Sequence, residues 1–366
     1  MKTQVALVAA MGICIFITFS TLYADDNLDA YEGVKDIKIG GHWFLTYLTG
    51  KVNTESRVNE FVINRGYINV YKKLSENLVG RITPDVSVDH EGDGLGDVEL
   101  RLKYAYLITK LKDLGFLKKP YFEFGLVHRP WIDYEQHINQ YRVQGTMFLE
   151  RVKLFNSADF GVTFTSFLGG ELEEEYQQVS KAYPGKFGSF SIGIYNGGGY
   201  HAIEVNENKP VETRLSLRPL NKKLPGLQFH YTGAYGKGNS DISPDWYLNA
   251  GMVSFESPRF TFTGQYFFAR GNSYGSYVDD DGVAKPSQGY SVFGDFKIPT
   301  KNLTLFARYD YWNGNEGESV THRTIAGAAY HFVDKSKVLI DYDLYRESSS
   351  GDAKSGFFEL AIEIKF

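Results

Sequence analysis

Apolar and polar residues alternate one by one along much of this chain. From Val98 to Ile108 every second residue is apolar or aromatic, and charged residues occupy the first places between them. The same two-residue period runs through 211–218, 303–311 and 358–366. Successive side chains of a β-strand point to opposite faces, whereas a helix would scatter these residues around its circumference. The pattern therefore predicts β-strands that have one apolar face and one polar face.

Turns and loops divide the chain into eighteen expected strands. Proline-containing turns fall at 219–225, 257–259 and 298–300, and proline suits such places because it cannot donate a hydrogen bond to a neighbouring strand. Longer, glycine-rich polar loops alternate with these turns. This asymmetry predicts an antiparallel transmembrane β-barrel with short periplasmic turns and longer extracellular loops. The longer loops cover 236–244, 271–288, 313–320 and 347–355.

The fold class is therefore all-β, with 18 strands expected and 16 as the alternative. The segment Glu174–Ala182 has the weakest strand signal because it is polar on both faces, and Tyr141–Arg151 is also counted as a strand. Even strand numbers are usual for single-chain bacterial barrels, so sixteen strands remain only if two segments fold into loops. Pro84 lies inside the third expected strand, where a bulge or a break in pairing is expected.

The first 24 residues have the features of a secretory signal. Lys2 is followed by the apolar stretch Val5–Phe19, and cleavage is expected after Ala24. A retained membrane anchor is the alternative, but the apolar stretch is shorter than the ~20 residues that a spanning helix needs. Residues 25–366 are then the exported barrel. The chain's single cysteine, Cys14, lies within the signal, so the barrel has no thiol for a disulfide or a zinc cluster.

Composition and the C-terminal strand indicate the bacterial outer membrane. The chain holds 27 Phe, 26 Tyr and 38 Gly, a bias that suits a membrane barrel with aromatic girdles. Its net charge of −5 argues against a nucleic-acid partner. Phe366 ends an alternating strand that resembles the last strand of outer-membrane proteins, which the barrel assembly machinery recognises. The other expected partners are outer-membrane lipid and lipopolysaccharide.

The function of such a barrel depends on the residues that face its interior, because a barrel of this width leaves an aqueous channel. Inward positions carry both signs of charge. Facing acidic and basic walls would orient polar solutes, and a track of arginines would bind anions. Mutual neutralisation, with no special site, is the third interpretation. The pore-lining residues predicted to contact solutes are Arg81, Glu99, Arg101, Lys103, Arg129, Glu212, Arg214, Arg218, Arg308 and Asp310.

A segment at 130–140 is the candidate for a constriction loop. It follows the fifth expected strand and is the third of the outer loops, the loop that often folds inward in porins. An ordinary surface loop is the alternative. The side chains expected to narrow the channel are Trp131, Asp133, Glu135 and His137.

Several segments together resemble the phosphate-selective porins O and P. The resemblance spans most of the barrel and implies a homotrimeric pore that passes anions along arginines in its lumen. Inward acids are about as numerous as inward bases in this chain, which leaves a phosphate preference open. The resemblance rests on Gly66-Tyr67 through Val79-Gly80-Arg81, on Asp97 to Leu107, on Glu123-Phe124-Gly125 before Arg129-Pro130-Trp131, and on Tyr195-Asn196-Gly197 followed by Lys209-Pro210 and Arg214 to Pro219.

The sequence thus predicts a passive diffusion channel for small hydrophilic solutes, with anions such as phosphate among the candidates. A substrate-specific transporter for anionic sugars, a barrel hydrolase and a structural or adhesion barrel are the alternatives. The chain has no Gly-x-Ser-x-Gly, His-Glu-x-x-His or phosphate-loop motif, so we expect no catalytic residues, no cofactor and no metal site.

Overall fold

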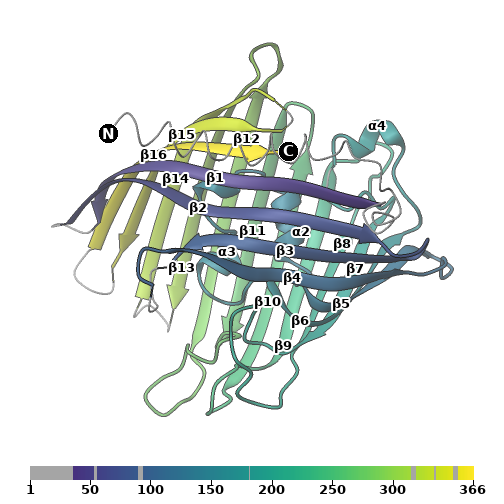
Figure 1. Ribbon diagram of the computed structural model, residues 1–366, viewed down its shortest axis with the longest axis horizontal. Coiled ribbons are helices and arrows are strands. Elements are labelled where there is room, and N and C mark those ends of the chain that lie inside the picture. The colour runs from purple at the N-terminus through teal and green to yellow at the C-terminus, as the bar shows by residue number, and fades with distance from the viewer. Residues whose placement is uncertain are drawn as a thin grey trace, which may run out of the picture. The chain divides into compact units, whose positions relative to one another are not determined.

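The computed structural model describes residues 36–52, 56–89, 94–180, 182–314, 319–333, 335–348 and 353–366. The expected signal segment, 1–24, lies outside the described residues. In the part that is described, sixteen strands form one closed barrel (Figure 1). The strands are β1 (Ile37–Val52), β2 (Ser56–Lys73), β3 (Leu78–Val88), β4 (Val98–Lys110), β5 (Leu117–His128), β6 (Ala158–Leu168), β7 (Gly188–Tyr195), β8 (Val211–Leu217), β9 (Leu227–Lys237), β10 (Asp245–Glu256), β11 (Phe260–Arg270), β12 (Pro286–Ile298), β13 (Leu303–Gly314), β14 (Ser319–His331), β15 (Lys337–Glu347) and β16 (Ala353–Lys365).

The first and last strands close the barrel. β1 pairs antiparallel with β16, from His42 opposite Lys365 to Lys51 opposite Gly356. The backbone N–H of Gly41 donates to the carbonyl of Phe366 at 3.0 Å, and Figure 1 shows purple β1 beside β16. This seam gives hydrogen-bond partners to the two strands that would otherwise form free edges.

The expectation of eighteen strands is wrong, and sixteen is correct. Residues 141–151 contain the 3-10 helix η3 (Arg142–Gln144) and the short helix α3 (Phe148–Arg151), and 174–182 begins with the helix α4 (Glu174–Gln177). The alternating apolar residues of the first segment pack inside the barrel instead of facing lipid. The second segment has no apolar face that could meet lipid.

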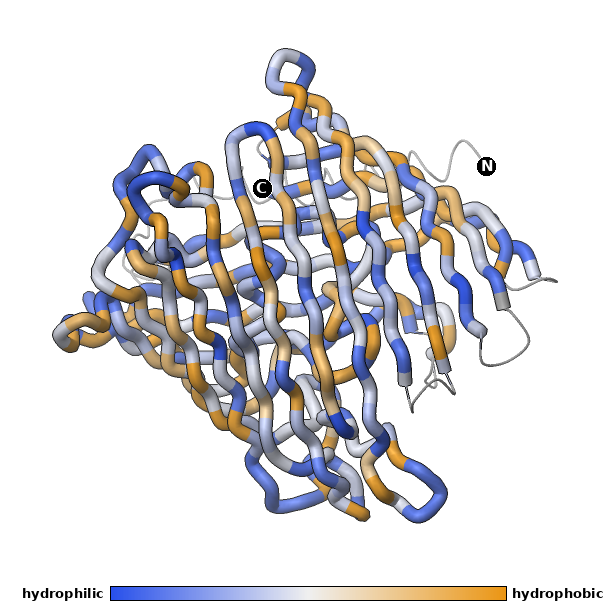
Figure 2. The backbone as a smooth tube through the Cα atoms, turned by 180° about the vertical axis from the view of Figure 1, so that it is seen from behind, coloured by the Kyte–Doolittle hydropathy of each residue, from blue (hydrophilic) through white to orange (hydrophobic). Residues whose placement is uncertain are grey.

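The remaining strands have one face toward the outside and one toward the interior. On β11, Phe262 is 46% exposed on the outer face, whereas the neighbouring Thr263 is 5% exposed on the inner face. Figure 2 shows the resulting alternation of hydrophobic and hydrophilic residues along the strands. An outer surface lined with exposed large apolar side chains matches the hydrocarbon layer of a bilayer.

The alternation on β4 is interrupted by a bulge. Thr83 pairs with Tyr104 and Pro84 pairs with Leu102, so Lys103 is the extra residue in β4. The irregularity expected at Pro84 is therefore confirmed. The bulge also shows that one prediction is wrong, because the apolar residues from Val98 to Ile108 do not all share one face. Leu102 faces outward, but Tyr104 turns inward and is 7% exposed. An extra residue shifts the two-residue period by one place, and Tyr106 and Ile108 follow Tyr104 to the inner side.

Two connections depart from the simple pattern of turns and loops. The connection between β5 and β6 contains the helix α2 (Ile132–Ile138) together with η3 and α3. The connection between β6 and β7, Gly169–Phe187, is long although it lies at the end of the barrel with the short turns, such as η4 (Pro299–Lys301). None of the helices that the structure describes has the length and hydropathy to cross a membrane.

A charge on the outer face of the barrel should destabilise it. Val292 is central in β12 and 40% exposed on the outer face. Val292→Arg should lower the free energy of unfolding in lipid bilayers by about 2–4 kcal/mol, because a cation would enter the middle of the hydrocarbon layer. Val292→Leu, which stays apolar, should leave the urea midpoint unchanged. Equal stability of both variants would show that this face does not contact lipid.

Candidate functional site

The connection between β5 and β6, residues 129–157, folds into the barrel, and we call it the inner segment. Figure 1 shows α2 and α3 within the ring of strands. The hydroxyl of Tyr134 donates to Oε1 of Gln228 on β9 at 3.1 Å. Nε of Arg214 on β8 donates to the carbonyl of Pro130 at 3.0 Å. The inner segment is thus bonded to the inner wall of the barrel.

Apolar contacts hold the inner segment against two arcs of the wall. Trp131, Phe148 and Leu149 pack with residues of β10 and β11 such as Trp246 and Phe267. Around η3, Tyr141 and Val143 pack against the arc from β12 to β1. The Tyr141 ring stacks on Phe306 with 4.5 Å between centroids. The residues of this second arc are Phe44, Phe293, Phe306, Ile325, Ala329, Leu339 and Ala361.

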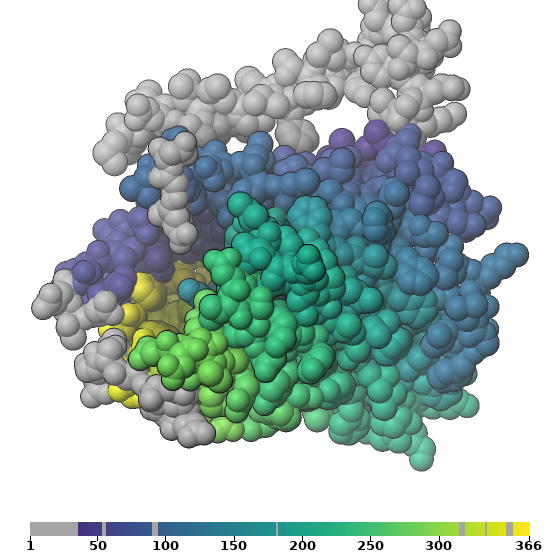
Figure 3. All heavy atoms as spheres, turned by 90° about the horizontal axis from the view of Figure 1, so that it is seen from below, coloured from purple at the N-terminus to yellow at the C-terminus, as the bar shows by residue number. Residues whose placement is uncertain are grey.

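Cavities lie on both sides of the inner segment. The turn-end cavity has a volume of about 900 Å³ and is lined by α2, η3 and the turn ends of β12 to β16. The loop-end cavity, about 310 Å³, lies between α3 and β13 to β15. In the space-filling view of Figure 3, a hollow opens between purple, yellow and green atoms.

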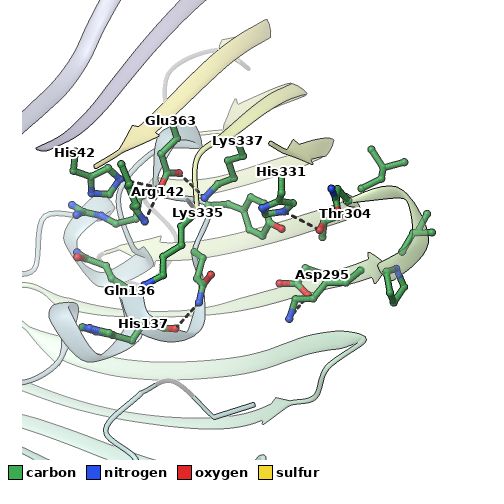
Figure 4. A pocket seen from close by; sticks show the side chains of 18 of the residues that line it. His42, Gln136, His137, Arg142, Asp295, Thr304, His331, Lys335, Lys337 and Glu363 are labelled. Atoms are coloured by element: carbon green, nitrogen blue, oxygen red, sulfur yellow. Dashed lines mark hydrogen bonds and ion pairs between the residues drawn. The ribbon is translucent and has the colours of Figure 1, made fainter. Parts of the chain in front are cut away.

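The linings of both cavities carry more basic than acidic side chains. Figure 4 shows Lys337 and His42 reaching the carboxylate of Glu363, while Arg142 and Lys335 point toward the space. The charged residues that line the loop-end cavity are Arg151, Lys153, Arg323 and Asp310. The charged residues of the turn-end lining are Arg142, Lys297, Lys335, Lys337, Lys365, Asp295 and Glu363.

Four inward bases form what we call the basic cluster: Arg65 on β2, Arg81 on β3, Lys103 on β4 and Arg142 on η3. Nζ of Lys103 lies 3.4 Å from the hydroxyl of Tyr67, and Nη2 of Arg142 lies 3.5 Å from it. Among the residues that the structure describes, none of the four forms an ion pair with a carboxylate.

The partners of Arg81 are neutral hydrogen-bonding groups, and its guanidinium lies 4.6 Å from the ring centroid of Tyr104. The bulge at Lys103 brings this ring into the cluster. Glu150 acts electrostatically on Lys103 and Arg142 without forming an ion pair with either. The groups that bond Arg81 are Asn69, Thr83, Tyr106 and His128.

An acidic cluster of Asp341, Asp343 and Glu359 lies on β15 and β16, on the other side of β1 from the basic cluster. Asp341 stands opposite Glu359 in the strand register. Asp341 is 3% exposed, and its carboxylate lies against that of Glu359. Nε of Arg323 donates to Asp343 at 2.8 Å. No described group of histidine and carboxylate side chains is arranged to hold a metal ion.

Three of the predicted solute-contacting arginines are fully buried. Arg129 bonds Asp159 at 2.6 Å and the carbonyl of Gly197 at 2.8 Å, and its Nε lies 3.4 Å from Glu212. Arg214 donates to Ser189 and Ser216 as well as to Pro130, and Arg218 donates to Ser180 and to the carbonyl of Gly185. Their guanidinium groups hold protein segments together, and the burial leaves them no open access to a solute.

The other residues predicted to line the lumen differ in how far their side chains are buried. Arg101 is more accessible, with 40% of its side chain exposed, and it pairs with Asp85 at 3.3 Å. Glu99 is half-buried on the same face of β4. Arg308 is buried, bonds Asp310 at 2.8 Å, and donates to the carbonyl of Thr146 at 2.9 Å. This last bond ties the inner segment to β13.

All four residues proposed for a constriction lie in the inner segment. Nε1 of Trp131 donates to Glu135 at 2.9 Å, and both are buried. Burial raises the pKa of Glu135 to about 7. Although burial of Asp133 opposes ionisation, His128 and His137 and a hydrogen bond from a tyrosine hydroxyl hold its pKa well below the usual range. His137 lines the turn-end cavity.

Sequence reasoning missed Arg142 and Arg151, because both lie in the segment that was taken for a strand. Arg151 bonds Asp310 at 3.0 Å and lines the loop-end cavity. One signal in the sequence could have exposed the error, because Phe148 occupies a place where alternation requires a polar residue. In the structure, Gly145 of the same segment has a φ of 130°, which residues with side chains rarely adopt.

The hydrolase alternative draws attention to His230 on β9. Its Nδ1 lies 2.9 Å from the hydroxyl of Ser216, and its Nε2 lies 2.9 Å from the hydroxyl of Ser254. A serine nucleophile needs a histidine whose second nitrogen is oriented by a carboxylate. Here both nitrogens bond serines, and the site is buried on the inner wall under Trp131 and Tyr134. The arrangement does not match a lipid-hydrolysing site.

A closed barrel of sixteen strands with polar residues inside and an inward-folded loop is the architecture of the porin class. Neither family models nor curated protein sequences match the chain. Several solved structures match the chain. OmpT of Vibrio cholerae lacking loop L8 matches with a TM-score of 0.61 at 13% identity, over 91% of this chain and 100% of that chain.

Two further channels match to the same degree. The outer membrane channel DcaP of Acinetobacter baumannii has a TM-score of 0.61 at 13% identity, over 90% of this chain and 97% of that chain. The anion-selective porin from Comamonas acidovorans has a TM-score of 0.61 at 8% identity, over 90% and 99%. At these identities the likeness establishes the fold: the chain has the sixteen-strand barrel of bacterial outer-membrane porins.

The inner segment should lose stability as the pH rises. The pKa of Glu135 is about 7 in the folded barrel but lies at the ordinary value of 4.5 in the unfolded chain, so the folded state binds more protons between these pH values. Stability should therefore fall across this window and stay low above it. We expect a lower urea midpoint at about pH 8 than at about pH 5, with Glu135→Gln reducing the difference. The exposed Glu174→Gln is the control, and an unchanged pH dependence in Glu135→Gln would contradict the assignment.

Removing Arg129 should destabilise the barrel strongly. Arg129→Ala leaves the buried carboxylates of Asp159 and Glu212 without their counter-charge, which costs about 3–5 kcal/mol. Lys209→Ala is the comparison, because it removes an ion pair with Glu204 whose lysine is 43% exposed, worth about 0–1 kcal/mol. Urea titration of both variants measures the difference. Similar costs for the two would show that the buried position of Arg129 adds nothing.

Proposed function

We propose that this protein is a passive diffusion channel of a bacterial outer membrane for small hydrophilic solutes, with a preference for anions such as phosphate. The closed barrel, its apolar outer face and its polar interior support a channel. The likeness to structures described as porins and channels supports the same function. The inner segment would narrow the channel through its contacts with two arcs of the wall.

The basic cluster is the observation that supports the anion preference. Its four cations have hydroxyl, amide, imidazole and aromatic neighbours, so their charge is not cancelled within ion-pair distance. Charge of one sign in a narrow, low-dielectric passage raises the local concentration of counter-ions. The bases of the two cavity linings add to this field.

Arg81, Arg101 and Arg142 are the first solute-contacting residues that we propose. Each is less buried than Arg129, and a guanidinium group can bind two oxygens of a phosphate or carboxylate at once. We assign the fully buried Arg129, Arg214 and Arg218 to holding the inner segment and the loops in place. The acidic cluster would orient a solute whose negative end is drawn to the basic cluster.

A substrate-specific transporter for anionic sugars is the second candidate. The favouring observation is that the inner segment separates a turn-end cavity of about 900 Å³ from a loop-end cavity of about 310 Å³. A cavity of the larger size can hold a small sugar. In that case the substrate should block the conductance at low concentration, whereas a diffusion channel would show little block.

We also propose that the protein forms a homotrimer. OmpT of Vibrio cholerae folded in vitro, which matches with a TM-score of 0.59 at 13% identity, is described in a trimer form. The size of the detergent-solubilised protein, measured by light scattering, tests this proposal.

The experiment that tests the anion preference is the reversal potential of single channels in a salt gradient across a planar bilayer. The wild-type protein should conduct and favour the anion. Arg142→Glu should shift the reversal potential toward the cation, because it inverts one charge of the basic cluster. Arg259→Glu makes the same change in net charge on an exposed turn and should leave the potential near the wild-type value. Identical potentials in all three proteins would refute the role of the cluster, and absence of conductance in the wild type would refute the channel.

A further inference from the structure

We infer that the connection between β6 and β7, Gly169–Phe187, holds the inner segment in position from the opposite end of the barrel and so sets the size of the solute that passes. We call it the turn-end segment. The inference rests on the proposed channel function. It concerns a segment that the sequence pattern presented as a polar strand, and it gives that segment a role in selecting solutes by size.

Tyr183 is the main contact between the two segments. Its ring stacks on Tyr134 of α2, with 5.5 Å between centroids and an angle of 19°. Its hydroxyl donates to Oδ2 of Asp133 at 2.9 Å. The edge of His137 lies against the same ring at 5.9 Å between centroids. One side chain of the turn-end segment therefore contacts three residues of α2.

Arg214 joins both segments to the barrel wall. Its guanidinium lies 4.0 Å from the ring centroid of Tyr134 and 5.0 Å from that of Tyr183. Hydrogen bonds of 2.8 Å to Ser189 and Ser216 fix the same group to β7 and β8. A buried cation close to two aromatic rings is favourable, because the rings replace part of the hydration that the charge has lost.

A second set of bonds holds the turn-end segment inside the barrel. Arg218 and Gln228 donate to the hydroxyl of Ser180 at 2.6 and 3.3 Å, and Ser180 donates to Glu256 at 3.2 Å. Ser180 and Ala182 are both fully buried. Ser180, three residues before Tyr183, is thus tied to β9 and β10, which holds the chain leading to Tyr183 in place.

The backbone at Tyr183 is strained, with a φ of 45° in a residue that is not glycine. The left-handed region is unfavourable for a bulky side chain, and such a residue stays there only where its surroundings hold it. The contacts of Tyr183 with α2 and Arg214 supply that restraint.

The position of α2 affects the width of the proposed passage, because α2 and the turn-end segment line the same cavity. Gln136 and His137 of α2 border the turn-end cavity, as does Gln178 of the turn-end segment. Figure 4 shows Gln136 and His137 at the edge of this space. If Tyr183 no longer holds α2, the helix can move and the passage beside it changes in width.

Single-channel recording combined with polymer exclusion tests the inference. Tyr183→Ala removes the ring and the hydroxyl, and we expect higher conductance and entry of larger neutral polyethylene glycols than in the wild type. Tyr183→Phe keeps the stack and should retain the wild-type size limit. Tyr183→Phe also loses the hydrogen bond to the carboxylate of Asp133. Brief openings to the higher conductance level expected for Tyr183→Ala should therefore be roughly tenfold more frequent than in the wild type. Tyr176→Ala, in the same segment on α4, is the matched control and should behave as the wild type.

The outcomes separate this inference from the proposed function. A wild-type protein without conductance refutes the channel itself. A conducting wild type whose Tyr183→Ala variant has the same conductance and the same polymer limit refutes the role of the turn-end segment. If Tyr183→Ala does not fold, Tyr183→Phe provides the test. A frequency of brief high-conductance openings equal to that of the wild type refutes the inference, and a raised frequency supports it.

Discussion

The structure depends on the need of every backbone polar group in a bilayer for a hydrogen-bond partner. Hydrocarbon offers no partner, so a sheet can cross it only when it has no free edge. Pairing of β1 with β16 meets this requirement and joins the two ends of the barrel. Once the barrel is closed, lipid meets only the outer faces of the strands, and all polar side chains of the strands must be accommodated inside. The buried charges of the interior follow from this division.

The interior contains two kinds of basic residue that composition cannot distinguish. Arg129, Arg214 and Arg218 are enclosed by carboxylates, carbonyls, hydroxyls and aromatic rings, and they hold the inner segment and the turn-end segment to the wall. Arg81 and Arg142 have neutral hydrogen-bonding partners, and Arg142 also lines the turn-end cavity. A buried guanidinium costs too much solvation to be left without partners, so the first group is structural. In the proposed channel, the second group would supply the electrostatic field that favours anions.

Much of the barrel could be predicted from the sequence, because exposure to lipid imposes a two-residue period that a single sequence displays. Sixteen of the eighteen expected strands form, but 141–151 shows where this reasoning stops. Its Tyr141 and Val143 are apolar because they pack on the inner wall, and that wall produces the same alternation as lipid. The constriction candidates were proposed from loop order alone, whereas Tyr183, whose hydroxyl bonds Asp133, lies 50 residues further along the chain and could not be predicted from spacing.

The sequence by itself determined the class of the fold, the face of most strands and the inward position of most charged residues, since these depend only on neighbours along the chain. Tertiary structure decided which apolar segments leave the wall, because packing inside and exposure to lipid both favour apolar side chains. It also decided the face of Tyr104 and Tyr106, which the single extra residue at Lys103 turns inward. The same holds for the grouping of Arg65, Arg81, Lys103 and Arg142, because strand register and the fold of a distant loop, not spacing in the sequence, bring their charges together.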